Sequence, residues 1–418
     1  MLRVIYYPPD AMKVLHIVPS YAPAWHLGGV VRAVTQFCTG LVSLGVDVTV
    51  FTTDSGQNRR MPVPLNRLVD LDGVKVYYFK TDFNLKYAYS RAFRQACRQF
   101  LKDFNLIHIT SFWCYPAIPA ISAAMDHQIP YLISVHGTLR NIALKLHDLK
   151  RFLYFHIIEK RHINSAAALH YTTEMERQLD STYQFRVPSF IVPNGIDTQK
   201  FQEDIDSEEA KRSYGLAPGS QVITFLGRLA PVKALDLLLQ AVAMPALLDQ
   251  NLQVLIAGPD AGAQSSLQQL VKELQLEARV RFLGGIDPKE RDRLFAASDI
   301  LALVSVNENF GYTAVEAMLA GVPVLLSEHV GICREVLANG AGMVVPLQVE
   351  AIARALAEML ADPAKLKAMG RAAAQASRRR YDLPIVAGKM LQAYQDILAG
   401  TRSPGLAWSD LHPTQALR

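Results

Sequence analysis

The sequence predicts an α/β protein built from two doubly wound parallel-sheet domains. Its 418 residues exceed the size at which one hydrophobic core usually stops growing, so two or three domains are expected. Short apolar runs alternate with helical patterns, which is typical of right-handed βαβ units around a parallel sheet. The alternation restarts after Pro193, so we expect a second sheet in the second half of the chain.

The first domain is expected to span residues 12–195. The run Val46–Thr52 is largely apolar and β-branched, as expected of a strand that is buried on both faces. A helix is predicted over Val30–Leu44. The predicted strands are Lys13–Val18, Val46–Thr52, Val74–Phe79, Leu106–Thr110, Tyr131–Val135, Ala167–Tyr171 and Phe190–Val192.

The second domain is expected to span residues 205–380, with one more helix over Pro384–Leu398. Its predicted strands are Val222–Leu226, Gln253–Ala257, Arg279–Leu283, Ile300–Val304, Val322–Leu326 and Gly342–Val345. Its predicted helices include Leu235–Val242, Leu267–Leu274, Lys289–Ala297 and Ala351–Leu360. Ligands of such sheets bind beyond the carboxyl ends of the strands, so two facing sheets predict a cleft between the domains.

Composition favours a cytoplasmic protein. No apolar run is long enough to cross a bilayer, and Pro8, Pro9 and Asp10 interrupt the N-terminus before the apolar part of a signal peptide can form. The cysteines are scattered without a C-x-x-C motif, so we expect buried, reduced thiols and no zinc site. They are Cys38, Cys97, Cys114 and Cys333.

The net charge of +5 is shared unevenly. Residues 1–195 carry 21 Lys and Arg against 13 Asp and Glu, whereas the remainder carries 22 against 25. A basic first domain favours a phosphorylated acceptor or an anionic lipid surface as a partner. No nucleic-acid-binding motif accompanies the charge, so nucleic acid is not expected to bind.

The segment from Glu308 to Glu316 carries the strongest functional signal. It holds two carboxylates eight positions apart, separated by a loop and by the start of an apolar helix. Gly311 permits a ligand to approach the backbone, and the start of the following helix offers N–H groups and a positive dipole end to an anion such as a phosphate. For an isolated pair of this kind, a helix start with two solvated acids is the alternative.

Other segments make this pair part of a larger pattern. In chain order they are Val192–Asp197, Phe225–Leu229, Pro231–Lys233, Ala257–Pro259 and Val280–Gly284. With this order and spacing, the chain resembles the family 4 retaining glycosyltransferases, nucleotide-sugar enzymes of the GT-B fold, and in particular those that build bacterial surface polysaccharide or glycolipid. The resemblance implies two facing Rossmann-like domains and a last helix that crosses back to the first domain.

Two cations, Arg228 and Lys233, follow the predicted strand Val222–Leu226. Arginine offers a fork of donors and lysine a compact charge, and both suit a phosphate. The resemblance implies that they bind the donor diphosphate, whereas the alternative is a pair of solvated loop cations. The chain is expected to lack a D-x-D metal motif, so we expect these cations, and not a metal ion, to stabilise the leaving group.

The glycine pair Gly28 and Gly29 occupies the first strand-to-helix turn, where a phosphate can approach the backbone. The pattern is not G-x-G-x-x-G, so a nicotinamide cofactor is not expected. The resemblance places such a pair beside the diphosphate and the acceptor, and a mere tight turn is the alternative. His136 ends the predicted strand Tyr131–Val135, and by resemblance it contacts the donor sugar near the reacting carbon.

The resemblance also assigns roles within the segment from Glu308 to Glu316. Glu316 would accept hydrogen bonds from the ribose hydroxyls, and Glu308 would lie near the donor sugar. Asn309, Phe310 and Gly311 would present backbone N–H groups to the sugar and the phosphate. Asn309 departs from the Gly or Ser that usually follows the first glutamate, which leaves the identity of the sugar open.

A cationic stripe is predicted on one helix of the first domain, because its residues recur at spacings of three and four. It consists of Arg91, Arg94, Arg98 and Lys102. A second basic stretch with interleaved aromatic residues runs from Lys145 to Arg161. Both are interpreted either as solvated faces or as surfaces that dock on the anionic inner leaflet of the cytoplasmic membrane.

The implied activity is metal-independent, retaining transfer of a hexose from a nucleotide-diphosphate sugar, such as a UDP- or GDP-hexose, to a hydroxyl of a glycan or lipid-linked acceptor. No further cofactor is expected. A GT-B epimerase and a nucleotide-sugar-binding scaffold without turnover are the alternatives. The four side chains Arg228, Lys233, Glu308 and Glu316 are all present, which argues against both.

Overall fold

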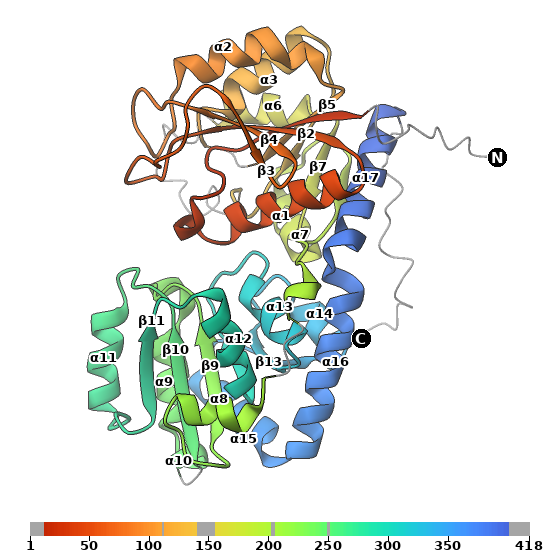
Figure 1. Ribbon diagram of the computed structural model, residues 1–418. Coiled ribbons are helices and arrows are strands. Elements are labelled where there is room, and N and C mark those ends of the chain that lie inside the picture. Colours follow the sequence, from red (N-terminus) through yellow and green to blue (C-terminus); the bar gives the residue numbers. More distant parts are fainter. Residues whose placement is uncertain (1–11, 111–112, 140–154, 202–204, 249–250, 401–418) are drawn as a thin grey trace, which may run out of the picture. The chain divides into compact units, whose positions relative to one another are not determined.

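The computed structural model describes residues 12–110, 113–139, 155–201, 205–248 and 251–400. Contacts divide the chain into two compact units (Figure 1). The first unit comprises Met1–Ile196 and Leu383–Arg418, and the second comprises Asp197–Asp382. Within the described residues, no helix has both the length and the apolar character that a membrane span requires.

The first unit is built on an eight-stranded sheet with the order β3-β4-β2-β1-β5-β6-β7-β8. All neighbours pair in parallel except the edge strand β3, which is antiparallel to β4. The strands are β1 (Lys13–Ile17), β2 (Asp47–Thr53), β3 (Leu68–Leu71), β4 (Val74–Phe79), β5 (Leu106–Thr110), β6 (Tyr131–Ser134), β7 (Ala168–Tyr171) and β8 (Ser189–Ile191). Every predicted strand is confirmed within two residues, and β3 is additional.

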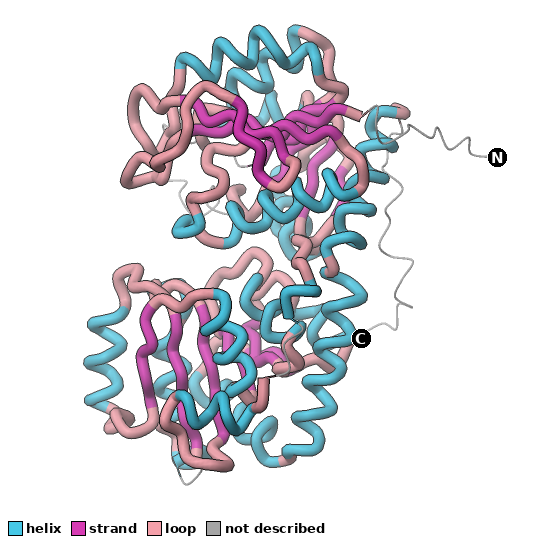
Figure 2. Tube along the Cα trace, in the orientation of Figure 1, coloured by secondary structure: helices cyan, strands magenta, loops and turns pink. Residues whose placement is uncertain are grey.

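Helices cover both faces of this sheet (Figures 1 and 2). Side chains of a strand alternate between faces, so Leu15 and Ile17 join the core under α2 and α3, whereas Val14 joins the core under α1 and α17. The helices are α1 (Gly29–Ser43), α2 (Arg91–Phe100), α3 (Ala117–Asp126), α6 (Lys160–Asn164), α7 (Glu174–Asp180) and α17 (Leu383–Leu398). Short turns of other helix types are η2 (Trp25–Leu27), η3 (Leu101–Asp103), η4 (Phe155–Glu159) and η5 (Ser181–Tyr183).

Helix α17 packs into the core of the first unit although it follows the whole second unit in sequence. Val386, Met390 and Tyr394 are fully buried there, against α1 and the sheet. Gly195 permits the approach, because a Cβ at this position would lie 2.9 Å from Leu383 Cδ1. The return of the last helix to the first domain, which the resemblance implies, is therefore seen in the structure.

The second unit is built on a six-stranded, fully parallel sheet with the order β11-β10-β9-β12-β13-β14. The strands are β9 (Gln221–Leu226), β10 (Leu252–Ala257), β11 (Val280–Gly284), β12 (Ile300–Leu303), β13 (Val324–Ser327) and β14 (Gly342–Val345). The helices are α8 (Ser207–Ser213), α9 (Leu235–Val242), α10 (Pro245–Leu248), α11 (Gln264–Glu273), α12 (Pro288–Ala297), α13 (Tyr312–Leu319), α14 (Cys333–Ala338), α15 (Val349–Ala361) and α16 (Pro363–Tyr381), with the 3-10 turns η6 (Thr198–Phe201) and η7 (Pro231–Lys233). The 19-residue α16 was not among the predicted helices.

The strand order of each sheet reverses at one point. In the second unit it reverses between β9 and β12, and in the first unit between β1 and β5. In doubly wound folds ligands bind beyond the carboxyl ends of the strands at such a switch point. The loops that follow these four strands are therefore where a site is expected.

Candidate active site

The two loops at the switch point of the second unit carry predicted phosphate and sugar residues. The loop after β9 ends at Lys233, and the loop after β12 contains Glu308. The two loops are joined by a hydrogen bond from Val306 N to Val232 O (2.9 Å) and by an ion pair between Lys233 Nζ and Glu308 Oε2. Folding thus brings together two predicted site residues that lie 75 positions apart in sequence.

These two charges are not solvated loop charges. The Lys233 side chain is 16% exposed and the Glu308 side chain 22% exposed. Arg228, by contrast, is exposed, and its side chain forms no hydrogen bond or ion pair with the part of the chain that the structure describes. The alternative of two solvated loop cations therefore fits the exposure of Arg228 but not that of Lys233.

The start of α13 forms the next part of the site. Gly311 has φ +92°, and a Cβ at this position would lie 2.9 Å from Val330 Cγ1, so the turn requires glycine. Gly331 N donates to Glu308 O (2.9 Å), which fixes the loop against the segment after β13. Ala314 N already donates to Gly311 O (3.0 Å), so α13 offers an anion mainly the positive end of its dipole.

The side chain of Phe310 is buried, so only its backbone is considered for a ligand contact. Its ring is 4% exposed and packs edge-on against Tyr381, with 5.5 Å between the ring centroids. Asn309 is partly buried beside it. The predicted use of backbone N–H groups in this segment is compatible with this geometry and remains a prediction.

Glu316 is buried within α13, with 2% exposure. Its Oε1 accepts a hydrogen bond from Arg291 Nη1 of α12 at 3.0 Å. Arg291 was not predicted as a site residue, because it stands in the charged run from Lys289 to Arg293 that reads as a solvated helix face. Nothing in the local sequence identifies Glu316 as its partner, since the two residues meet only in the tertiary structure.

The glycine pair of the first unit lies at the start of α1. Gly28 has φ +92° and is the N-cap of this 15-residue helix, and Gly29 is its first residue. A Cβ at either glycine would meet no atom within 4 Å, so the described chain leaves open space there. The pair can therefore receive a ligand at the helix start, as the sequence predicts, but no contact tests the role.

His136 follows β6 in the left-handed region, with φ +48°, and Gly137 continues the turn with φ +72°. The buried carboxylate of Glu176 holds this turn, because its Oε1 accepts from Gly137 N while its Oε2 accepts from Thr172 N (2.8 Å). Burial, followed by the neighbouring His170, lowers the pKa of His136 to about 3. His136 is therefore neutral near pH 7 and can contribute a hydrogen bond, but not a charge.

A chain of buried, neutral polar groups runs through the first unit. Burial lowers the pKa of His170 to about 4, and its Nε2 must donate to Val192 O (2.7 Å), because a carbonyl only accepts. Its Nδ1 then accepts from the Ser134 hydroxyl (2.5 Å), and Ser134 Oγ accepts from His108 Nε2. His108 Nδ1 finally accepts from Tyr394 OH of α17 (2.6 Å). All hydrogen bonds of this series therefore donate in one direction, from Tyr394 towards Val192 O. The series connects α17 to the residue that follows β8.

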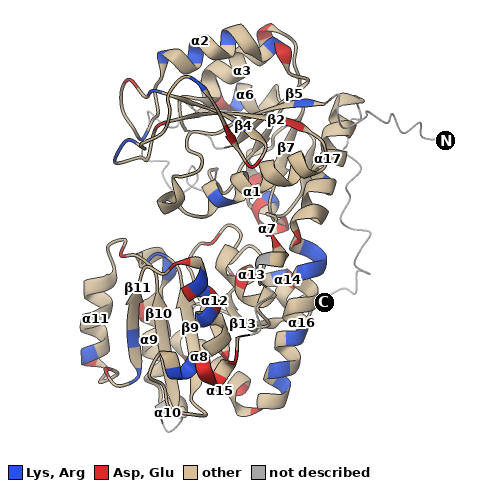
Figure 3. Ribbon diagram, in the orientation of Figure 1, with Lys and Arg blue, Asp and Glu red and all other residues tan. Residues whose placement is uncertain are grey.

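The cationic stripe lies on α2 and η3, where Figure 3 colours lysine and arginine blue. All four of its members, Arg91, Arg94, Arg98 and Lys102, are exposed. Phe93 and Leu101 point into the core, and Phe100 is 43% exposed. Most of the second basic stretch, including Lys145, lies outside the described residues.

One cysteine and the D-x-D motif differ from the expectations. Cys38, Cys97 and Cys333 are buried free thiols as expected, but Cys114 is only partly buried. Two aspartate pairs do have D-x-D spacing, so the expectation that the chain lacks this motif is wrong. Asp70 and Asp72 form the turn between β3 and β4, where Gly73 N donates to Asp70 Oδ1 (3.0 Å), at the amino ends of the strands.

The second pair, Asp204 and Asp206, belongs to the second unit. Asp204 is outside the described residues, and Asp206 caps α8 through Glu209 N (2.7 Å). Among the described residues, no group of three or more His, Cys, Asp or Glu is arranged to hold a metal ion.

Comparisons with known proteins agree with the geometry. A family model described as "Glycosyl transferases group 1" matches residues 206–376, and one described as "Glycosyltransferase Family 4" matches residues 27–200. The D-inositol 3-phosphate glycosyltransferase of Corynebacterium aurimucosum is 28% identical over 384 residues, which cover 87% of this chain and 90% of that protein. The protein of the same name from Nocardia farcinica is 31% identical over 296 residues, which cover 68% of this chain and 65% of that protein.

Solved structures share the fold. Sucrose-phosphate synthase from Thermosynechococcus elongatus superimposes with a TM-score of 0.73 at 21% identity, covering 93% of this chain and all of that one (100%). Anabaena HepE in complex with UDP-glucose gives a TM-score of 0.68 at 19% identity, covering 91% and 98%. The matched models together span both units, so the chain belongs to glycosyltransferase family 4, has the GT-B fold and is a glycosyltransferase.

Proposed function

We propose that this enzyme is a retaining hexosyltransferase that uses a nucleotide-diphosphate sugar and needs no metal ion. The observation that carries the proposal is the ion pair between Lys233 and Glu308 beside the start of α13, at the switch point of the second unit. A cation, a carboxylate and a helix N-terminus are thereby gathered at one sheet edge. Such a set suits a sugar diphosphate, because the phosphate needs positive groups and the sugar hydroxyls need an acceptor.

The chemical step breaks the bond between the anomeric carbon and the diphosphate oxygen, and negative charge develops on the leaving phosphate. The Lys233 ammonium has three donors, so its bond to Glu308 leaves two for the phosphate. Arg228 is exposed and adds a second cation with a fork of donors. The start of α13 adds the positive end of a fixed helix dipole, which needs no reorganisation as the charge develops.

Retention of configuration is proposed to follow a reaction on one face of the sugar. In this scheme the leaving phosphate oxygen takes the proton of the acceptor hydroxyl, while that hydroxyl oxygen bonds to the anomeric carbon. No carboxylate nucleophile is assigned. His136, which is neutral, contributes a hydrogen bond to a sugar hydroxyl and no charge.

The donor is proposed to be a UDP- or GDP-hexose. Support for UDP comes from Anabaena HepE, which was solved with UDP and with UDP-glucose. A panel of UDP-, GDP- and ADP-hexoses, incubated with the enzyme and chelator, tests this through donor hydrolysis, since no acceptor is required. Release of nucleoside diphosphate from one or two donors, with the anomeric configuration of the sugar retained, is expected. Hydrolysis of none, together with no binding of UDP or GDP, would refute the proposal.

The acceptor is proposed to be a hydroxyl of a glycan or lipid-linked glycan that carries phosphate. The basic balance of residues 1–195 supports an anionic acceptor. Relatives named for D-inositol 3-phosphate make that compound a reasonable first soluble acceptor to test. With the donor identified, transfer to D-inositol 3-phosphate should be compared with transfer to unphosphorylated inositol and to an undecaprenyl-diphosphate glycan.

A lipid-linked acceptor would place the enzyme on the inner face of the cytoplasmic membrane. The four exposed cations of α2 and η3 are the proposed contact, since each contributes about 1 kcal/mol near an anionic surface before screening by salt. Co-sedimentation with anionic liposomes should weaken as salt rises and should fall when Arg91, Arg94, Arg98 and Lys102 are all changed to Gln. Equal sedimentation with neutral liposomes would leave α2 as an ordinary solvated face.

A further inference from the structure

A second carboxylate of the site, Glu316, is held by a residue outside the segment that contains it. Glu316 is 2% exposed, and its Oε1 accepts from Arg291 Nη1 at 3.0 Å. A buried carboxylate loses its hydration, so it needs a charged hydrogen-bond partner to stay ionised without a large penalty. Arg291 supplies that partner from α12, which lies next in sequence to β11.

Arg291 is itself held on three sides. Its Nε and Nη2 both donate to Asp292 Oδ1, at 2.9 and 2.7 Å, and its guanidinium carbon lies 4.4 Å from the centroid of the Phe201 ring. Only 14% of its side chain is exposed. A guanidinium can hold two carboxylates in a fixed plane, which a lysine ammonium cannot do.

The helix that carries Arg291 is fixed at its start. Asp287 and Glu290 form a capping box, in which Glu290 N donates to Asp287 Oδ1 (2.9 Å) and Asp287 N donates to Glu290 Oε2 (3.0 Å). Pro288 occupies the first helical position, where its missing N–H has no consequence. Arg291 therefore projects from a rigid turn, and its reach to Glu316 does not depend on a mobile loop.

We propose that Arg291 is a positioning residue for the donor, which aims the Glu316 carboxylate at the two ribose hydroxyls. This inference rests on the proposed function, in which Glu316 accepts from those hydroxyls. A carboxylate has about four acceptor positions, so the bond from Arg291 to Oε1 leaves acceptor capacity for the ribose. Arg291 thereby determines selectivity for ribonucleotides over 2′-deoxyribonucleotides without touching the nucleotide.

The test measures binding of UDP, GDP, 2′-dUDP and 2′-dGDP by calorimetry. The readout is the ratio between the affinity for the ribonucleotide and the affinity for its 2′-deoxy form. A charge-assisted hydrogen bond to a hydroxyl corresponds to a ratio of about tenfold or more in the wild type. Glu316→Gln should bring this ratio close to one.

Arg291→Met should lower the ratio at least about threefold, while the affinity for the 2′-deoxy form stays within about twofold of the wild type. Arg291→Lys keeps a cation but loses the fork, so its ratio should be intermediate. Asp292→Asn loosens the guanidinium and should also lower the ratio. The last two variants decide the question if Arg291→Met does not fold, which thermal unfolding would reveal.

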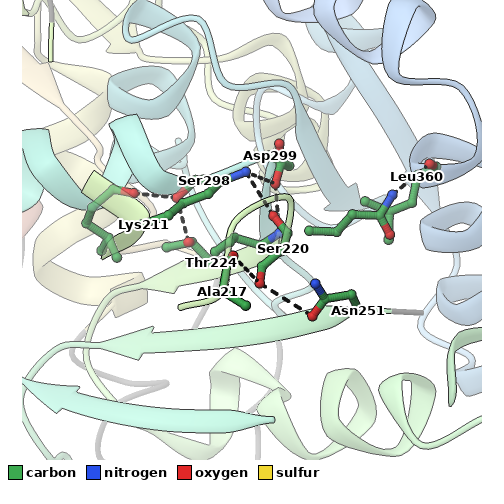
Figure 4. A network of polar contacts seen from close by, with 11 residues as sticks. Lys211, Ala217, Ser220, Thr224, Asn251, Ser298, Asp299 and Leu360 are labelled. Carbon is green, nitrogen blue, oxygen red and sulfur yellow. Dashed lines mark hydrogen bonds and ion pairs between the residues drawn. The ribbon is translucent and has the colours of Figure 1, made fainter. Parts of the chain in front are cut away.

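Lys211→Met is the matched control. Lys211 is a buried cation of the same unit, paired with Asp299 Oδ2 at 3.1 Å and with Ser220 O at 2.9 Å (Figure 4). This pair joins the amino ends of β9 and β12, at the edge of the sheet opposite to the site. The control should lower stability and leave the ratio unchanged.

The two proposals fail in different ways. If Glu316→Gln keeps the wild-type ratio, Glu316 does not bind the ribose and the proposed donor site is wrong in that part. If Glu316→Gln collapses the ratio but Arg291→Lys and Asp292→Asn both keep it, only the positioning role of Arg291 is overturned. An equal fall in both affinities for the Arg291 variants would also overturn it, because that result indicates a general structural role.

Discussion

The two units share a topology but differ in the polar groups that lie near their switch points. In both sheets the strands follow the same spatial order on each side of the switch point. The first unit has two additional strands, the edge strand β3 and the strand β8. The interior of the first unit holds neutral histidines, which are linked through Ser134 to Val192 O and Tyr394 OH. The corresponding region of the second unit holds ion pairs, namely Lys233 with Glu308 and Arg291 with Glu316. The first unit also has an ion pair, between Asp54 and Arg60 (2.7 Å), but it is not part of the histidine chain.

This difference supports the proposal that the second unit binds the diphosphate of the donor. A neutral histidine chain fixes geometry and orients hydroxyl groups, but it supplies no net charge for a diphosphate. Half-buried ion pairs keep full charges close to a sheet edge, where low solvent exposure makes them stronger than in water. The first unit carries excess positive charge on its surface instead, where it can attract an anion without holding it in one geometry.

The largest expected effect comes from removing a cation at the switch point of the second unit. Arg228→Ala and Lys233→Ala should each lower kcat/KM roughly 10²-fold or more, on the order of 3 kcal/mol, because each is proposed to stabilise the leaving diphosphate. Steady-state kinetics with the donor found by the hydrolysis panel measures this effect. Arg212→Ala, which removes an exposed cation of α8, is the control and should be close to wild type.

The two variants should also differ in stability, and this sharpens the comparison. The Arg228 side chain is exposed and forms no hydrogen bond or ion pair with described residues, so its loss should leave the melting temperature unchanged. Loss of Lys233 removes the ion-pair partner of the partly buried Glu308 carboxylate. The Lys233 variant should therefore have a lower melting temperature than the wild type. Wild-type turnover in either variant would mean that the charge difference between the units does not serve the donor.

A smaller effect is expected from the histidines of the first unit as pH falls. Burial, then His136 and His170, lower the pKa of His16 to about 3, and burial lowers that of His170 to about 4, against an ordinary value of 6.5. Both rings are thus neutral when folded and charged when unfolded between these values. Their stabilising contribution is complete above about pH 6.5 and is lost as pH falls toward 4, by about 1.4 kcal/mol per pH unit for each ring.

This pH dependence is tested by urea unfolding between pH 7 and pH 4, with tryptophan fluorescence as the readout. Trp25 and Trp113 both lie in the first unit, whereas residues 197–382 contain no tryptophan. His16→Gln should flatten the pH dependence of the unfolding free energy by about one proton. His127→Gln, which changes an exposed histidine of the same unit, should keep the wild-type profile. An identical slope for His16→Gln and the wild type would contradict the neutral-interior account.

The smallest expected effect is that of a chelator, which should leave activity unchanged. The proposed leaving-group stabilisation relies on Arg228, Lys233 and the start of α13, so no divalent ion is required. Activity in excess EDTA, measured against added Mg²⁺ or Mn²⁺, checks this. Complete loss that either ion restores would show that the cations of the second unit are not sufficient.

Sequence reasoning predicted most of the fold, because buried parallel strands have a strong local signature. Runs such as Val322–Leu326 are apolar on both faces, so their positions could be read within two residues. The strand β3 was missed because neither of its faces is buried and its residues alternate between exposed and half-buried. Its pairing with β4 therefore has no apolar pattern in the sequence from which it could be predicted.

The sequence by itself determined the residue types that the site needs and the loops that carry them. Gly311, Glu308 and Lys233 each follow a strand, and the carboxyl ends of parallel strands share one edge, so their proximity was predictable in outline. What only the tertiary structure decided is which charges neutralise each other. Lys233 meets Glu308, and Arg291 meets Glu316, because the strand order makes β9 and β12 neighbours and packs α12 near α13. Ion pairing depends on distances of a few ångströms, and the spacing of residues along a chain does not fix such distances across separate elements.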